Sequence, residues 1–272
     1  MTIFPLLFDE RVRPTGPFVS TWSLHPSVLI GTGLFAALYI YGITTWRRRS
    51  APSERVNTWQ VVSFGFGLLL LLGSLNGPIH DLSDYYLFSA HMLQHLLLTL
   101  VVPPLLLVGT PGWLLSRFFA RPPILRTARF VTSPVVAGAL YSLTIIFWHL
   151  VPMYDLMMRN HEVHIATHLM FIVMATIMWW PVLSPSPEVP RASPGVRMLY
   201  LFLVGIPMQI VAAPISLADN VLYTWYAAAP RTWGITALQD QQIGGLMMWV
   251  PAGLYLWGAI AIVFFVWTSK EK

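Results

Sequence analysis

Residues 85–104 read YYLFSAHMLQHLLLTLVVPP, an apolar run that holds His91 and His95 four positions apart. A bilayer core about 30 Å thick is crossed by about 20 apolar residues in a helix, and this run is long enough. Ionisable side chains inside a membrane are costly and usually mark function. The stretch therefore predicts a transmembrane helix that carries a functional pair of histidines.

The rest of the chain is similarly apolar. Of its 272 residues, 56% are hydrophobic and 10% are charged, which excludes an ordinary soluble domain. We predict an all-α integral membrane protein, a bundle of seven transmembrane helices within residues 26–268. We expect a short interfacial helix within 110–123. The seven spans are predicted at 26–46, 58–76, 84–109, 132–150, 162–181, 196–216 and 241–267.

Basic residues indicate which way the chain faces. Twelve of the sixteen Lys and Arg follow the first, third, fifth and seventh predicted spans, and the positive-inside rule places those loops in the cytoplasm. Residues 1–25, which lack the order typical of a cleaved signal, are then an extracytoplasmic segment, and 269–272 form a cytoplasmic tail. The net positive charge of the chain thus reflects its orientation in the membrane, and we expect no nucleic-acid partner.

All eight histidines fall at the predicted outer ends of the spans. Helix positions three or four apart share a face, so His91 with His95 and His164 with His168 form two pairs at the same depth. Two such pairs can converge on one ion. An interfacial role accounts for His25, and His161 extends the second pair outward. The predicted metal ligands are His91, His95, His164, His168, His149 and His80.

Other polar and aromatic residues have supporting roles. Asp81, Asp240 and Gln242 lie in the same outer layer and are predicted to orient the imidazoles from a second shell. The methionines are expected mainly to fill gaps between helices. Pro103 and Pro104 are expected to kink the third span. Aromatic belts at the membrane boundaries are predicted to include Trp46, Trp59, Trp179, Trp180, Trp267, Trp22, Tyr85, Tyr86 and Trp225.

The ligand atoms available in the chain limit which metal ions it can bind. The chain has no cysteine, and imidazole suits copper, zinc, iron and nickel, with thioether favouring Cu(I). Copper, as Cu(I) or Cu(II), fits best, and zinc is compatible. Three function classes remain: a copper-handling assembly protein, a membrane metalloenzyme such as a zinc hydrolase or di-iron oxidase, and a b-haem protein.

Two observations separate these classes. A metalloenzyme needs a carboxylate beside the metal as general base, and apart from Glu162 we identify none within the predicted spans. A haem needs only two histidines and leaves the others unexplained. We therefore expect a non-enzymatic, copper-binding protein.

Several motifs together resemble a known family. In chain order they are LFSAHMLQHLLL, VVPPLLLVGTP, FWHLVPMYD, HEVHIATH, MWWPV and QQIGGLMMWVP, spread over about residues 84–267. They resemble the seven-helix CtaG-type assembly factors of cytochrome c oxidase. The positions that match the family's motifs are His91, His95, His149, His164 and His168. The family often has Glu directly before the last histidine, where this chain has Thr167.

The resemblance implies a multi-pass protein of the bacterial plasma membrane. Such a protein is required to mature a haem-copper oxidase of the respiratory chain, and we expect it to do so by supplying copper. Its expected partners are an oxidase subunit or a copper chaperone, in addition to the lipid bilayer.

Overall fold

The computed structural model describes Phe18 and residues 24–271, and every regular element within them is helical. Most of the predicted segment 1–25, including Trp22, therefore lies outside the described residues. The elements are α1 (Pro26–Tyr41), η2 (Gly42–Trp46), α2 (Arg47–Ser50), α3 (Thr58–Ser74), α4 (Gly77–Tyr85), α5 (Phe88–Leu96), η3 (Leu97–Val101), α6 (Val102–Gly109), α7 (Gly112–Phe119), α8 (Pro122–Val131), α9 (Pro134–His149), α10 (Val151–Arg159), α11 (His161–Leu183), α12 (Pro194–Ser216), α13 (Thr224–Ala227) and α14 (Ala237–Thr268).

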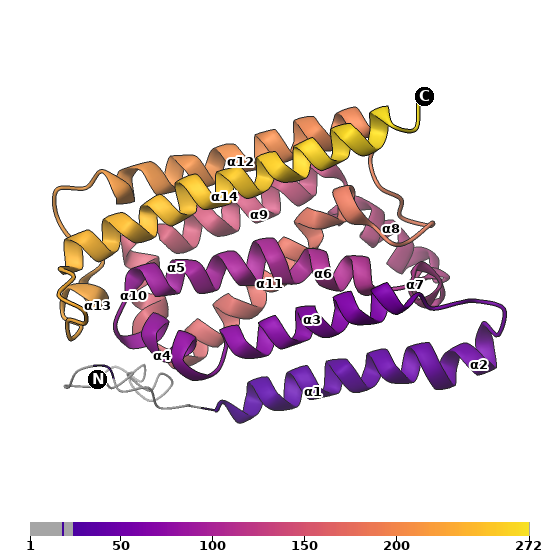
Figure 1. Ribbon diagram of the computed structural model, residues 1–272, viewed down its shortest axis with the longest axis horizontal. Coiled ribbons are helices and arrows are strands. Elements are labelled where there is room, and N and C mark those ends of the chain that lie inside the picture. The colour runs from indigo at the N-terminus through magenta and orange to yellow at the C-terminus, as the bar shows by residue number, and fades with distance from the viewer. Residues whose placement is uncertain (1–17, 19–23, 272) are drawn as a thin grey trace.

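The long helices run side by side along the longest axis of the molecule (Figure 1). The short helices α4, α10 and α13 gather at one end, and α2, α7 and α8 gather at the other. By length and composition, five helices in the described part could cross a membrane, or seven if each of two bent pairs counts as one span. The all-helical membrane class is thus confirmed, with five to seven candidate spans.

The first bent pair brings a predicted loop into the bundle. α3 and α4 meet at 45°, where Gly77 takes a φ of +68°, a left-handed conformation that costs glycine little. Pro78 then begins α4, where its missing N–H costs nothing. The residues between the second and third predicted spans, together with the start of the third, therefore form a helix that buries His80 and Asp84.

A π-helical segment, η3, interrupts the third span just before the predicted proline kink. Pro103 has no N–H to donate to the carbonyl of Thr99 four residues earlier. Trp179 Nε1 on α11 donates to that carbonyl instead, at 3.0 Å. The prediction that Trp179 belongs to a boundary belt is therefore wrong, because this side chain is 2% exposed and bonds inside the bundle.

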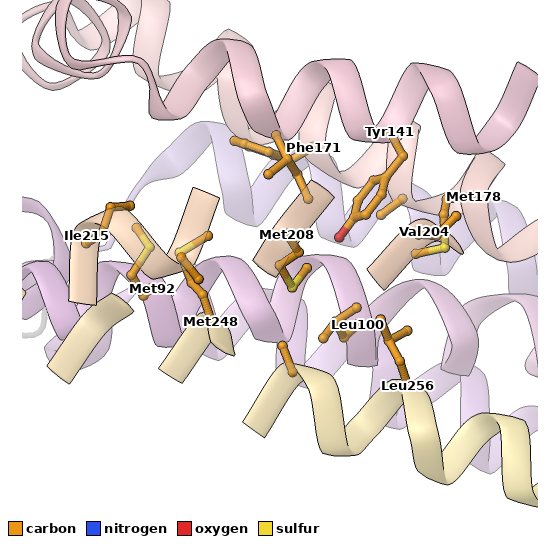
Figure 2. Close-up of a cluster of buried hydrophobic side chains, with 14 of the residues drawn as sticks. Met92, Leu100, Tyr141, Phe171, Met178, Val204, Met208, Ile215, Met248 and Leu256 are labelled. Carbon is orange, nitrogen blue, oxygen red and sulfur yellow. The ribbon is translucent and has the colours of Figure 1, made fainter. Parts of the chain in front are cut away.

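The core between α5, α9, α11, α12 and α14 is rich in sulfur and aromatic side chains (Figure 2). Met92, Met178, Met208 and Met248 are all buried there. Flexible thioethers fill irregular gaps between helices, so these contacts agree with the packing role expected of the methionines.

We expect Gly245→Ala to loosen the packing of α14 against α12. A Cβ at Gly245 would lie 2.5 Å from Ser216 Oγ and 2.7 Å from Ser216 N, so the backbone must shift, at about 1 to 3 kcal/mol. Thermal unfolding of the protein in detergent measures the loss. Gly258→Ala on the same helix is the control, because nothing lies within 4 Å of that position; equal melting of both variants would contradict the close approach.

Candidate metal centre

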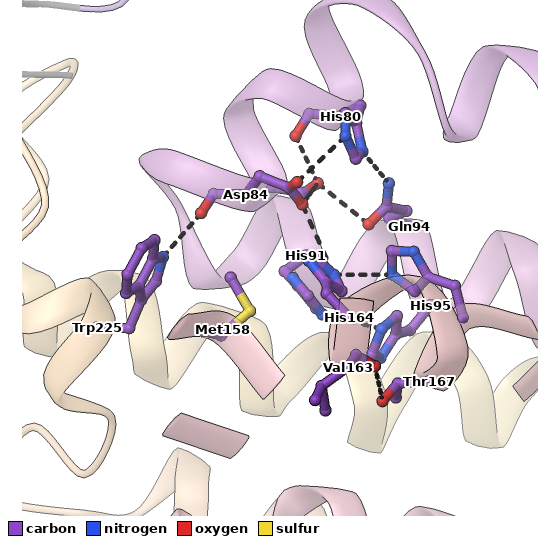
Figure 3. A network of polar contacts seen from close by, with 12 residues as sticks. His80, Asp84, His91, Gln94, His95, Met158, Val163, His164, Thr167 and Trp225 are labelled. Atoms are coloured by element: carbon purple, nitrogen blue, oxygen red, sulfur yellow. Dashed lines mark hydrogen bonds and ion pairs between the residues drawn. The ribbon is translucent and has the colours of Figure 1, made fainter. Parts of the chain in front are cut away.

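Four of the predicted ligands come together in the structure. On α5 the Nε2 atoms of His91 and His95 are 2.8 Å apart, and on α11 those of His164 and His168 are 3.2 Å apart. Across the two helices, the ring centroids of His91 and His164 are 5.4 Å apart, as are those of His95 and His168. Figure 3 shows the side chains of His91, His95 and His164 close to one another.

Two groups of three residues have the geometry to hold an ion among the described residues. One is His91, His95 and His168, and the other is Asp84, His91 and His164. In each group, one ligand atom per residue lies within 4.8 Å of the others, and all of these residues are buried. His91 belongs to both groups, so the two groups form one continuous cluster.

Asp84 is the residue that the sequence prediction missed. Its Oδ2 lies 3.1 Å from His80 Nε2 and its Oδ1 lies 3.8 Å from His164 Nε2, and the side chain is fully buried. The expectation that only Glu162 offers a carboxylate within the spans is therefore wrong. The available signal was the four-residue spacing of His80 and Asp84, which places both on one face if the segment is helical.

His80 occupies a layer outside the two ligand groups. Gln94 Nε2, which cannot accept, donates to His80 Nδ1 at 3.2 Å. In the neutral ring the proton then sits on Nε2 and is donated to Asp84. Both nitrogens of His80 are thus engaged, Nδ1 with Gln94 and Nε2 with the Asp84 carboxylate.

Tyr226 sets the tautomer of His91. Its single hydroxyl proton is donated to the carbonyl of Ser83, so the hydroxyl oxygen accepts from His91 Nδ1 at 3.1 Å. His91 then directs its Nε2 lone pair into the cluster, where it faces His95 Nε2 at 2.8 Å. The neighbouring Trp225 donates from Nε1 to the Asp84 carbonyl at 2.7 Å; it is 2% exposed, so its predicted place in a boundary belt is wrong.

His149 closes the inner side of the cluster at the end of α9. Its Nδ1 donates to the Ile145 carbonyl at 2.8 Å, which leaves the Nε2 lone pair free. That Nε2, like His95 Nδ1, is buried without a hydrogen-bond partner, and the two rings are 6.3 Å apart. A buried nitrogen without a partner is costly, and an ion at this place would remove that cost.

Tyr223, in the loop before α13, supports the end of α9. Its hydroxyl donates to the His149 carbonyl at 3.0 Å. Burial, with a smaller contribution from Asp155, raises the pKa of Tyr223. The hydroxyl therefore stays protonated and keeps donating.

The three residues predicted to orient the imidazoles lie in different places. Asp240 accepts from Phe88 N at 2.7 Å, Ser89 N at 3.0 Å and Ser89 Oγ at 2.6 Å, so it caps the first turn of α5, the helix of His91 and His95. Gln242 donates to the Ala218 carbonyl at 3.1 Å. Asp81 is buried on α4, next to His80.

The two remaining histidines lie at the outer edge of the cluster. The His25 ring packs edge-on against His80, with centroids 4.4 Å apart, and lies 6.4 Å from the ring of His161. Burial, followed by the nearby His80, lowers the pKa of His25. Its ring is therefore mostly neutral at pH 7 and able to act as a ligand.

A comparison with known protein families identifies the family of the chain. The family model described as "Cytochrome c oxidase caa3 assembly factor" matches residues 37–270, which include every predicted ligand. The chain belongs to this family. The resemblance seen in the sequence motifs is thereby confirmed. The buried Thr167, directly before His168, donates to the Val163 carbonyl at 2.7 Å (Figure 3).

Three similar curated proteins come from mycobacteria. The uncharacterized proteins Mb0105 of Mycobacterium bovis and MT0111 of Mycobacterium tuberculosis are each 24% identical over 279 residues, covering 95% of this chain and 41% of theirs. The uncharacterized protein ML1998 of Mycobacterium leprae is 22% identical over 265 residues, covering 90% and 38%. The chain thus spans about two fifths of the length of these relatives. No solved structure matches it.

We expect Asp240→Ala to destabilise this assembly factor more than Gln242→Ala. The first change leaves the backbone N–H groups of Phe88 and Ser89 without their acceptor, at about 1 to 3 kcal/mol. The second removes one donor from a carbonyl that has a second lone pair for other partners. Thermal unfolding in detergent compares them; a smaller loss for Asp240→Ala would show that the cap is not required.

Proposed function

We propose that this assembly factor binds copper through His91, His95, His164 and His168, with His149 beside them, and supplies it to a haem-copper oxidase. The observation that carries the proposal is that ring nitrogens of buried histidines from α5 and α11 lie within 4.8 Å of one another. The predicted outward position of this end of the bundle suits copper that arrives from outside the cell.

The donor set supports an imidazole-bound ion. Nitrogen ligands lie about 2.0 to 2.1 Å from such an ion, so two of them at a tetrahedral angle are about 3.3 Å apart. The Nε2 separations of 2.8 Å and 3.2 Å within the two pairs are close to that value. Tyr226 and the Ile145 carbonyl hold His91 and His149 in the tautomers that direct Nε2 inward.

Membership in the family supports the second half of the proposal. An assembly factor of cytochrome c oxidase interacts with that oxidase, and copper is a cargo that links a histidine cluster to this role. We propose an oxidase subunit as acceptor and a copper chaperone as donor. Because the described side chains offer imidazole and not thiolate, the ion is held by neutral ligands that exchange readily for those of an acceptor.

A membrane metalloenzyme is the second candidate, and Asp84 is the observation that favours it. This carboxylate lies 3.8 Å from His164 Nε2, where it could act as the general base of a zinc hydrolase. Its other oxygen contacts His80 Nε2 at 3.1 Å, which fixes the orientation of the carboxylate. Hydrolytic activity that requires zinc and is lost in Asp84→Asn would favour this candidate over copper supply.

We expect the purified protein to retain copper against a weak chelator and His91→Ala/His95→Ala to lose it. The double variant removes one helix's contribution to both ligand groups. Copper per chain is measured by metal analysis after dialysis. Thr176→Ala is the control, since it removes a polar side chain of α11 that bonds only within its own helix and is outside both groups, and it should retain the copper.

Two outcomes would contradict the assignment. Equal copper in wild type and the double variant would remove these residues from the site, and a Soret band would favour haem. In cells that lack the chain, wild type but not the double variant should restore oxidase activity. Restoration by both would leave a scaffolding role and exclude copper supply through this cluster.

Tyr226→Phe should weaken copper binding about 10- to 100-fold, the usual effect of losing a hydrogen bond that orients a ligand histidine. The variant removes the acceptor for His91 Nδ1 and releases the ring to its other tautomer. Competition with a chelator of known affinity measures the change. Tyr200→Phe, which loses a hydroxyl bonded to the Met178 carbonyl, should bind copper as wild type does; equal affinity in both variants would contradict the role of Tyr226.

A further inference from the structure

A groove of about 360 Å³ opens beside the histidine cluster, between α1, α3 and α11. Most of its lining is apolar, but five histidines also line it: His25, His80, His161, His164 and His168. Two of these belong to the buried ligand pairs, and three lie outside them. The groove therefore joins the outer histidines to the cluster.

At the outer end of the groove, a specific backbone contact holds His25 in place. The backbone N–H of His25 donates to Asn76 Oδ1 at 2.7 Å, and Asn76 in turn donates to the Leu72 carbonyl at 3.0 Å. This bond ties the start of α1 to the bend between α3 and α4. It places the His25 ring 6.4 Å from His161.

That spacing leaves room for one ion between the two rings, since imidazole binds a metal at about 2.0 to 2.1 Å. His80 lies against His25, but its nitrogens are engaged with Gln94 and Asp84. His25 and His161 are therefore the pair left to receive an ion at the outer end.

The inner end is reached along one face of α11. His161, His164 and His168 are three and four positions apart, so they form a single stripe. At 1.5 Å per residue, the stripe spans about 10 Å from its first to its last ring. His164 and His168 are also members of the buried ligand groups.

We propose that His25 and His161 form a second, outer copper site, which receives the ion and passes it down α11 to His164 and His168. The inference rests on the proposed function and adds the route by which the buried cluster is loaded. Each step exchanges one copper–imidazole bond for another, with the copper unchanged in oxidation state. The largely apolar groove wall offers few other ligands, so the ion follows the imidazoles.

The rate of copper uptake tests the proposed route, and the final copper content tests the buried site separately. Metal-free wild type and His25→Ala/His161→Ala, both full-length in detergent, are mixed with Cu(I) supplied as its acetonitrile complex. The reaction is stopped at set times with a chelator, and the copper that resists removal is measured. We expect the double variant to load copper about tenfold more slowly and to reach the same final amount of chelator-resistant copper. We also expect it to lack the second copper ion per chain, the one bound at the outer site, which the chelator removes readily from wild type.

The controls keep the test decisive. Ser27→Ala/Thr32→Ala changes polar side chains of the same groove and should load as wild type does. The single variants His25→Asn and His161→Asn should each slow loading, which supports the route even if the double variant is unstable. Equal rates and equal copper in wild type and all histidine variants would overturn the outer site alone, whereas wild type without chelator-resistant copper would overturn the proposed function as well.

Discussion

Backbone groups inside an apolar bundle must find partners within the protein, and this requirement governs how the helices are broken and joined. Wherever the chain bends to bring histidines together, a side chain from another element bonds the exposed backbone. Asp240 accepts at the start of α5, and Trp179 donates to the carbonyl freed by Pro103. Trp225 and Tyr226 donate to carbonyls at the end of α4. The histidine cluster therefore depends on long-range hydrogen bonds as much as on the helices themselves.

The sequence was sufficient for the features that depend on apolar length and local spacing. The helical membrane class and the two histidine pairs follow from runs of about 20 apolar residues and from the four-residue intervals on α5 and α11. Both hold in the structure, where the two pairs face each other. The family resemblance holds for the same reason, since its motifs are local stretches around these histidines.

What the sequence did not reveal depends on contacts between distant segments. Asp84 enters the cluster because the chain turns at Gly77, and hydropathy does not indicate whether a polar stretch after a bend leaves the bundle or folds back. Tyr226 lies 135 positions from His91, with no spacing rule to link them. Trp179 and Trp225 were predicted to lie at the membrane boundary because tryptophan is common at that depth, but each donates a hydrogen bond to a buried backbone carbonyl.

The charge of Asp84 has a consequence for which ions the cluster tolerates. The histidines that surround it supply lone pairs but no charge, whereas an ionised Asp84 supplies one negative charge among fully buried groups. A monovalent ion would leave the loaded cluster electrically neutral. A divalent ion would leave one positive charge uncompensated by Asp84 in apolar surroundings, where unpaired charge is strongly disfavoured. Under the proposed function, a single buried carboxylate would therefore favour a monovalent over a divalent ion in the cluster.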